Sequence, residues 1–316
     1  MHAQGTNKRY ALCESQTMKY GTDPTTLDTA ERDLLQAISQ QPNTSWYVWL
    51  DCAFDVADEL QTPIADKSIN VYQIKEMTDM KHLGPRLVQV FAPGDDLKKV
   101  QTQLRPWLTH ASGRPMLSLW ASDQSAHTLA KHLQAWSWAY TPDKEAVLLR
   151  LADTRSACSL QQTLQPAQWH GLTAPLRQWL YINRQGKVTT LPVGPSFDAP
   201  NHAATQLPLV LDDEQIQTMA NTAEADALLH HIATQTPEVI PEGVLPSTMH
   251  SYTTWVLHTA EQRGVEKRSD KLSLLMAACF SRGKVMKDPR LESLLTLKNY
   301  TAGQLHHALA EQGLLA

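Results

Sequence analysis

The sequence predicts an α/β or α+β protein of two lobes, with a mixed N-terminal lobe built on a central sheet and an all-α C-terminal lobe. Its 316 residues exceed the usual length of one domain. Short apolar runs of strand length alternate with helical stretches in the first part. The second part shows only residue patterns that are typical of helix starts and helix ends. With 42% hydrophobic and 19% charged residues, the chain has a globular composition.

Helices and strands alternate in the N-terminal part, which indicates an α/β layer. Residues 28–41 predict a helix that begins with Asp28, and residues 122–137 predict another that begins with Ser122 or Asp123. Strands are expected where β-branched and aromatic residues gather in short runs. These runs are 46–51, Val71–Ile74, Leu87–Phe91, Pro115–Trp120, Ala146–Leu151 and Trp179–Ile182.

An exposed connection is expected between the lobes, because four prolines and no periodicity occur between Leu191 and Pro208. The predicted organisation is therefore an N-terminal lobe at 1–195, a linker at 196–208 and a helical lobe at 209–316.

About five helices are predicted in the C-terminal lobe from their capping residues. The expected start signals are the Asp212-x-x-Gln215 capping box, Ser247, Ser269 or Asp270, Asp288 followed by Pro289, and Thr301-x-x-Gln304. The expected stop signals are Gly264, Gly283 and Gly313.

Composition and motifs exclude several classes of function. No apolar run reaches the length of a membrane span, and the N-terminus has no signal-peptide core, so we expect a cytoplasmic protein that binds no membrane. A net charge of -4 is unlike that of a nucleic-acid binder. No phosphate-binding glycine motif, H-E-x-x-H or C-x-x-C is present, which predicts neither a cofactor nor a metal site.

The alternative to a non-enzyme is a hydrolase of unrecognised type whose site is assembled from scattered Asp, His and Ser residues. Ser122, His132 and Asp153 are one such set. No local sequence presents this serine on a sharp turn beside oxyanion donors, so we do not favour a catalytic role.

The run R-L-A-D-T-R at 150–155 follows a predicted strand and is the candidate partner-binding site. Arg150 and Asp153 are spaced to form an ion pair that locks the turn. Alternatively, one arginine, such as Arg155, stays available to hold a partner's carboxylates or carbonyls.

Nine tryptophans are many for this length. Most are expected in the core. Trp169 and Trp179 are candidate interface anchors, because an indole joins an apolar body to one hydrogen-bond donor.

Five short motifs follow one another along the N-terminal part. They are HLGPRLV at 82–88, GRPMLSLWAS at 113–122, LAKHL at 129–133, VLLRLADTR at 147–155 and APLRQWLYINRQG at 174–186. This ordered series resembles the effector chaperones, or adaptors, of type VI secretion. The order and spacing of the motifs carry the resemblance, since each motif alone is common. The resemblance extends weakly into the helical lobe.

The resemblance implies a cytoplasmic, non-catalytic adaptor that binds a toxic effector, expected to be held by its N-terminal region, and the VgrG spike protein. A structural subunit of the secretion machine is a further alternative. The family has no catalytic residues to transfer. The positions that match its recurring motifs are Gly84, Pro85, Arg150, Asp153, Arg155, Pro175 and Trp179.

Overall fold

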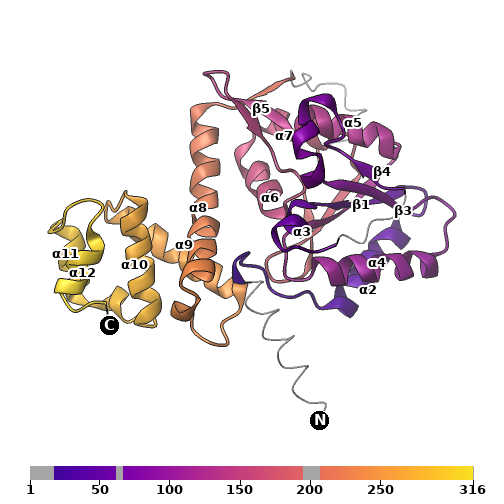
Figure 1. Ribbon diagram of the computed structural model, residues 1–316. Coiled ribbons are helices and arrows are strands. Elements are labelled where there is room, and N and C mark those ends of the chain that lie inside the picture. Colours follow the sequence, from indigo (N-terminus) through magenta and orange to yellow (C-terminus); the bar gives the residue numbers. More distant parts are fainter. Residues whose placement is uncertain (1–17, 62–66, 195–206, 316) are drawn as a thin grey trace, which may run out of the picture. The chain divides into compact units, whose positions relative to one another are not determined.

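The computed structural model describes residues 18–61, 67–194 and 207–315 (Figure 1). The chain divides into two compact units, of which one is Pro24–Thr222 and the other combines Met1–Asp23 with Ala223–Ala316. The predicted class is confirmed, with a sheet in the first unit and a mostly helical C-terminal part. The predicted linker at 196–208 lies outside the described residues except for Leu207 and Pro208.

A six-stranded sheet forms the centre of the unit Pro24–Thr222. Its order is β2-β3-β1-β4-β7-β8. All neighbouring strands in this sheet pair antiparallel. The helices between them therefore do not connect parallel neighbouring strands. The expected strands at 46–51, Leu87–Phe91 and Trp179–Ile182 are found within a residue. The strands are β1 (Ser45–Leu50), β2 (Ile69–Asn70), β3 (Arg86–Phe91), β4 (Leu117–Ser122), β7 (Gln178–Ile182) and β8 (Val188–Leu191).

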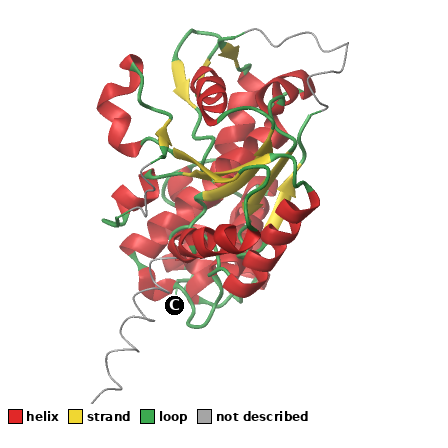
Figure 2. Cartoon of the chain, turned by 90° about the vertical axis from the view of Figure 1, so that its right-hand side faces the viewer, coloured by secondary structure: helices red, strands yellow, loops and turns green. Residues whose placement is uncertain are grey.

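Helices cover both faces of this sheet (Figure 2), because alternate side chains of each strand point to opposite faces. Tyr47 and Trp49 of β1 pack in a core with α5, α6 and α7. On the opposite face, α2 and α4 contact each other and the strands, and Leu34 of α2 lies beside Leu119. These helices are α2 (Leu27–Gln40), α4 (Leu97–Ala111), α5 (Ala126–Trp136), α6 (Thr154–Thr163) and α7 (Pro166–Thr173).

The strand expected at Val71–Ile74 is wrong. Pairing in β2 ends at Asn70, whose side chain accepts a hydrogen bond from the Tyr72 amide at 2.9 Å and donates one to the Lys81 carbonyl at 2.8 Å. These bonds turn the chain into a 3-10 helix, η1 (Lys75–Leu83). Val71 and Tyr72 are buried and Ile74 is partly buried, in a turn instead of a strand.

One helix differs from expectation at its start, and another was not expected. Helix α5 begins at Ala126 and is capped by Ser125, which accepts from the Thr128 amide at 3.2 Å, and not by Ser122 or Asp123. Helix α4 was not predicted, because Pro106 lies inside it. Asp96 caps α4 through a 2.9 Å hydrogen bond from the Lys98 amide.

A second, three-stranded sheet has the order β6-β5-β9, in which β5 and β9 are parallel. The residues of β9 therefore belong to the unit Pro24–Thr222. Helix α8 (Asp213–Gln235) begins in this unit and ends in the other. The predicted capping box is confirmed by reciprocal hydrogen bonds of 3.1 and 2.8 Å between Asp212 and Gln215. The strands are β5 (Trp138–Tyr140), β6 (Ala146–Leu148) and β9 (Leu209–Val210).

The helical unit has its own core, formed by leucine, alanine and valine side chains of α8 and of the helices after it. The expectation of about five helices is confirmed within the described C-terminal residues. The helices after α8 are η2 (Pro237–Val239), α9 (Pro246–Gln262), α10 (Arg268–Phe280), η3 (Val285–Lys287), α11 (Pro289–Thr296) and α12 (Leu305–Glu311).

The caps of these helices are partly those predicted. Asp288 caps α11 by accepting from the Arg290 amide at 2.9 Å. Ser247 does not cap α9; its amide and hydroxyl donate to Asp23 at 2.8 and 2.6 Å. Asp270 of α10 accepts from the amides of Gly303 and Leu305, so it caps α12 in place of the predicted Thr301-x-x-Gln304 box.

No helix in the described residues is long and apolar enough to cross a membrane.

Candidate functional site

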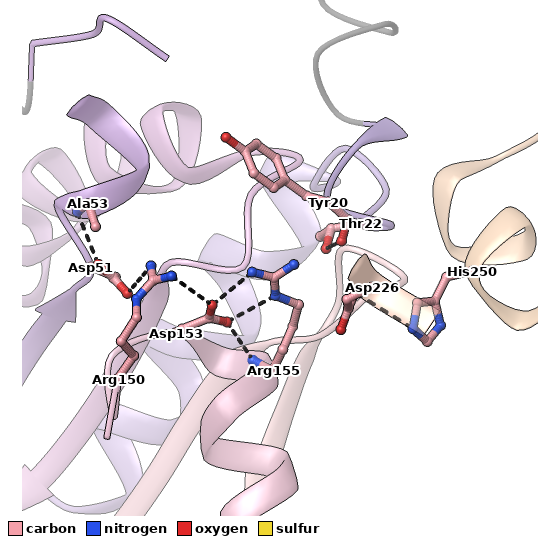
Figure 3. Close-up of polar contacts among 9 residues, drawn as sticks. All are labelled: Tyr20, Thr22, Asp51, Ala53, Arg150, Asp153, Arg155, Asp226 and His250. Carbon is pink, nitrogen blue, oxygen red and sulfur yellow. Dashed lines mark hydrogen bonds and ion pairs between the residues drawn. The ribbon is translucent and has the colours of Figure 1, made fainter. Parts of the chain in front are cut away.

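Asp51 follows strand β1 and is 3% exposed. Its carboxylate accepts hydrogen bonds from the Ala53 amide at 3.0 Å and from Nη2 of Arg150 at 2.8 Å (Figure 3). Burial raises the pKa of Asp51 to about 6, against the opposing charge of Arg150 and together with the like charge of Asp153. Asp51 was not predicted as a site residue, since its partner lies 99 residues away.

Asp153 links the strand end to helix α6. It is 3% exposed and caps α6 by accepting from the Arg155 amide at 3.0 Å. The Arg155 guanidinium also binds this carboxylate with two donors, Nε at 3.1 Å and Nη2 at 2.8 Å. Nη1 of Arg150 lies 3.8 Å from the same carboxylate. Asp51, Asp153, Arg150 and Arg155 thus form one ion cluster, with two charges of each sign.

Phe54 of the short helix α3 (Ala53–Ala57) packs against both guanidinium groups of the ion cluster. The guanidinium carbons of Arg150 and Arg155 lie 5.0 and 5.5 Å from its ring centroid. Cation–π attraction therefore adds to the ion pairs. Both the stacking and the carboxylates restrict the two guanidinium planes.

The pairing differs from the simple Arg150–Asp153 lock that the sequence predicted. Asp153 is bound mainly by Arg155, because the cap brings that side chain back over its own helix N-terminus. Arg150 is bound mainly by Asp51. The Arg150 side chain is 40% exposed and that of Arg155 is 19% exposed, so Arg150, and not Arg155, presents more of its surface to solvent.

Burial lowers the pKa of Arg150, but the charges of Asp51 and Asp153 outweigh this effect and raise it. Arg150 therefore stays protonated. Chemically, the ion cluster can hold the turn and offer one guanidinium edge to an incoming carboxylate or carbonyl. Such a ligand would have to compete with Asp51 for the donors of Arg150.

A second polar group is formed by another residue of α3. Asp55, 2% exposed, accepts from Nε2 of His110 at 2.7 Å and lies 3.4 Å from Nη1 of Arg114. Arg114 also donates to the His110 carbonyl. These residues were not predicted; the only available signal was the acidic residues that follow the buried strand in DCAFD.

An open hollow of about 770 Å³ lies beside α2 and α4. Most of the residues that line it have polar side chains, among them Glu31, Arg105 and His110. None of the predicted site residues lines this hollow.

Trp169 and Trp179 are buried, with 5% and 1% of their surface exposed. Their rings stack at 5.8 Å, and Trp179 meets Trp120 edge-on at 4.9 Å. Each indole N–H donates within the chain, to the Pro192 carbonyl at 2.8 Å and to Ser118 Oγ at 3.1 Å. The structure therefore places both tryptophans in the core and not on the surface as interface anchors.

Three other motif residues have structural roles within the fold. A Cβ atom on Gly84 would lie 2.0 Å from Oδ1 of the hydrogen-bonded Asn70 side chain, so only glycine fits there. The Pro85 carbonyl accepts from the Val71 amide at 3.1 Å. The Pro175 carbonyl accepts from Ser122 Oγ at 2.6 Å.

The residues considered for a hydrolase have separate partners in the described structure. Ser122 donates to Pro175, and Nε2 of His132 lies 2.8 Å from the Leu172 carbonyl. Asp153 is bound by arginines. No hydrogen bond among the described residues joins two members of this set.

Within the described ranges, no group of three or more His, Cys, Asp or Glu residues is placed to hold a metal ion. Cys52, Cys158 and Cys279 are not joined in disulfide bonds, and Cys13 lies outside the described residues.

Residues 34–171 match a protein-family model described as a domain of unknown function, DUF4123. The matched segment begins in α2, ends in α7 and contains the whole ion cluster. No curated protein and no solved structure matches the chain.

Proposed function

We propose that this chain is a non-catalytic adaptor that binds a type VI secretion effector and promotes its loading onto the VgrG spike protein. The observation that carries the proposal is the match of residues 34–171 to DUF4123, a domain known in type VI effector adaptors and chaperones. Four of the five motif runs that suggest an adaptor lie inside this matched segment.

Arg150 is the member of the ion cluster best suited to touch a partner. Its side chain is 40% exposed, whereas those of Asp51 and Asp153 are each 4% exposed. A planar guanidinium held by an aromatic ring loses little conformational entropy when it binds a carboxylate. In this proposal, the two aspartates and Phe54 position Arg150, and Arg150 contacts the effector.

Gene deletion tests the adaptor role in a strain with an active type VI machine. Without this chain, the effector encoded beside the VgrG gene should disappear from the secreted fraction, while VgrG is still secreted. The chain itself should stay in the cells. Loss of VgrG secretion, or recovery of the chain in the secreted spike, would contradict an adaptor and indicate a structural subunit.

Co-purification of that effector with variants tests the role of Arg150. Arg150→Met keeps an apolar stem on Phe54 and removes the charge. Arg177→Met is the matched control, because the Arg177 side chain is 45% exposed and also pairs with a carboxylate, that of Asp123 at 2.7 Å. We expect effector recovery to fall about tenfold for Arg150→Met only. Equal recovery with both variants would remove Arg150 from the interface.

A further inference from the structure

The described part of the helical unit exposes one aromatic side chain in the middle of α9 and another at the end of α10. Trp255 of α9 is 46% exposed, although none of the other eight tryptophans is among the exposed side chains. Phe280, the last residue of α10, is 47% exposed. Exposure of two large aromatic rings in one small helical unit is unfavourable in water unless a partner covers them.

Tyr252 connects Trp255 to the turn that follows α10. Its ring lies 5.6 Å from the Trp255 ring, and its hydroxyl donates to the Ala278 carbonyl at 3.3 Å. A Cβ atom on Gly283 would lie 3.4 Å from the same hydroxyl. Trp255 and the turn at 281–284 therefore both lie close to the Tyr252 side chain.

This turn is held rigidly by its own hydrogen bonds. Gly283 donates to the Ala278 carbonyl at 2.7 Å, and Arg282 donates to the Cys279 carbonyl at 3.0 Å. Arg282 and Gly283 both have positive φ angles, of 51° and 81°, as in a left-handed helix C-cap. A turn fixed in this way presents its side chains without a large loss of entropy on binding.

The charges of the turn are all positive. Arg282, Lys284 and Lys287 follow Phe280, and no Asp or Glu occurs between Lys271 and Lys287. Arg282, Lys284 and Lys287 make no ion pair within the described residues. Tyr252, Trp255, Phe280, Arg282, Lys284 and Lys287 are called here the aromatic–basic surface.

We infer that the aromatic–basic surface docks an acidic polypeptide segment that also carries leucine or aromatic side chains. Apolar side chains of the segment cover Trp255 and Phe280, and its carboxylates meet Arg282 and Lys284. A polypeptide fits better than a nucleic acid, because three cations on a chain of net charge -4 do not make an extended phosphate-binding face. The inference takes one point from the proposed function, namely that the partner is a polypeptide.

Fluorescence anisotropy of a labelled synthetic peptide tests the inference on the full chain. The peptide has 20 residues in helical register, with Glu on one face and Leu and Phe on the other, roughly the length of a long helix. A peptide with Lys in place of Glu and a single-stranded DNA of similar length are the controls. We expect the acidic peptide to bind at least about tenfold more tightly than either control. Preference for the Lys peptide or the DNA overturns the inference.

Substitutions locate the binding. Arg282→Glu with Lys284→Glu, and separately Trp255→Ala, should each weaken binding of the acidic peptide by about tenfold or more. Lys98→Glu with Lys99→Glu, in the exposed first turn of α4, makes the same change in charge and should alter binding by less than about twofold. All these side chains are exposed, so circular dichroism should show wild-type folding. Binding that all the variants retain equally would overturn the inference.

The same variants separate this inference from the adaptor role. If wild-type chain co-purifies with the effector and the Arg282→Glu, Lys284→Glu and Trp255→Ala changes leave recovery unchanged, the adaptor proposal stands and the surface does not hold the effector. Loss of acidic-peptide binding in the same variants then supports the docking inference, and retained peptide binding overturns it. If wild-type chain recovers no effector, the adaptor proposal fails, and the peptide measurements alone decide whether the surface binds acidic segments.

Discussion

Asp153 combines three roles that are usually spread over several residues. It caps α6, binds the Arg155 guanidinium with both oxygens and lies within ion-pair distance of Arg150. The sequence indicated an ion pair here, because arginines flank the aspartate after a strand. It could not indicate Asp51 as the second carboxylate, since a contact between residues 99 positions apart depends on the whole sheet.

Removal of Asp153 should destabilise the protein strongly. Asp153→Ala leaves the Arg155 guanidinium without its carboxylate and α6 without its cap, so we expect the free energy of unfolding to fall by about 3 kcal/mol or more. Asp123→Ala is the control, because Asp123 is 47% exposed and its pair with Arg177 should contribute less than about 1 kcal/mol. Urea unfolding measures both, and equal effects would show that burial of the ion cluster adds nothing.

Asp51 should make stability depend on pH. Its pKa of about 6 lies above the ordinary value of 3.8 for an aspartate, so the folded state binds a proton more tightly than the unfolded state. The resulting stabilisation is complete below pH 4 and is lost as the pH rises through 6. Two pKa units correspond to roughly 3 kcal/mol. Unfolding measured from pH 4 to pH 7 should show wild type losing stability relative to Asp51→Asn; parallel curves would contradict the raised pKa.

At the scale of elements, local signals predicted helix starts well where the cap lies next to the helix in sequence. The Asp212–Gln215 box and the Asp288 cap are both found. Local signals failed to predict the helix start where a residue distant in sequence supplies the cap. Asp270, 2% exposed, accepts from the Gly303 amide at 2.7 Å and the Leu305 amide at 2.9 Å, so α10 fixes the start of α12.

Two substitutions decide which residue caps α12. Asp270→Ala leaves two amides of a half-buried helix start without acceptors, and we expect a loss of about 2 kcal/mol in the free energy of unfolding. Thr301→Ala removes the side chain of an exposed residue and should change stability by less than about 0.5 kcal/mol. Thermal unfolding followed by circular dichroism measures both. A larger effect at Thr301 would restore the cap that the sequence suggested.

At the scale of the whole molecule, the sequence predicted a sheet-containing part and a helical part, but not where the chain passes between them. Proline content marked residues 196–208. The compact units instead include β9 and the first half of α8 with the sheets, because Leu209, Leu211 and Ile216 pack in that core. Such packing depends on the parallel pairing of β5 with β9, which local periodicity does not show.

The two units should unfold in separable steps, because each has its own hydrophobic core. Eight of the nine tryptophans lie in Pro24–Thr222, and only Trp255 lies in the helical unit. Tryptophan emission therefore reports mainly on the sheet-containing unit, whereas circular dichroism at 222 nm reports on helices of both. In urea, Asp153→Ala should lower the midpoint seen by emission. Asp270→Ala should lower the midpoint of a dichroism transition and leave the emission midpoint unchanged. A shift of both probes together in both variants would mean that the units unfold as one, since destabilising either core would then destabilise the other.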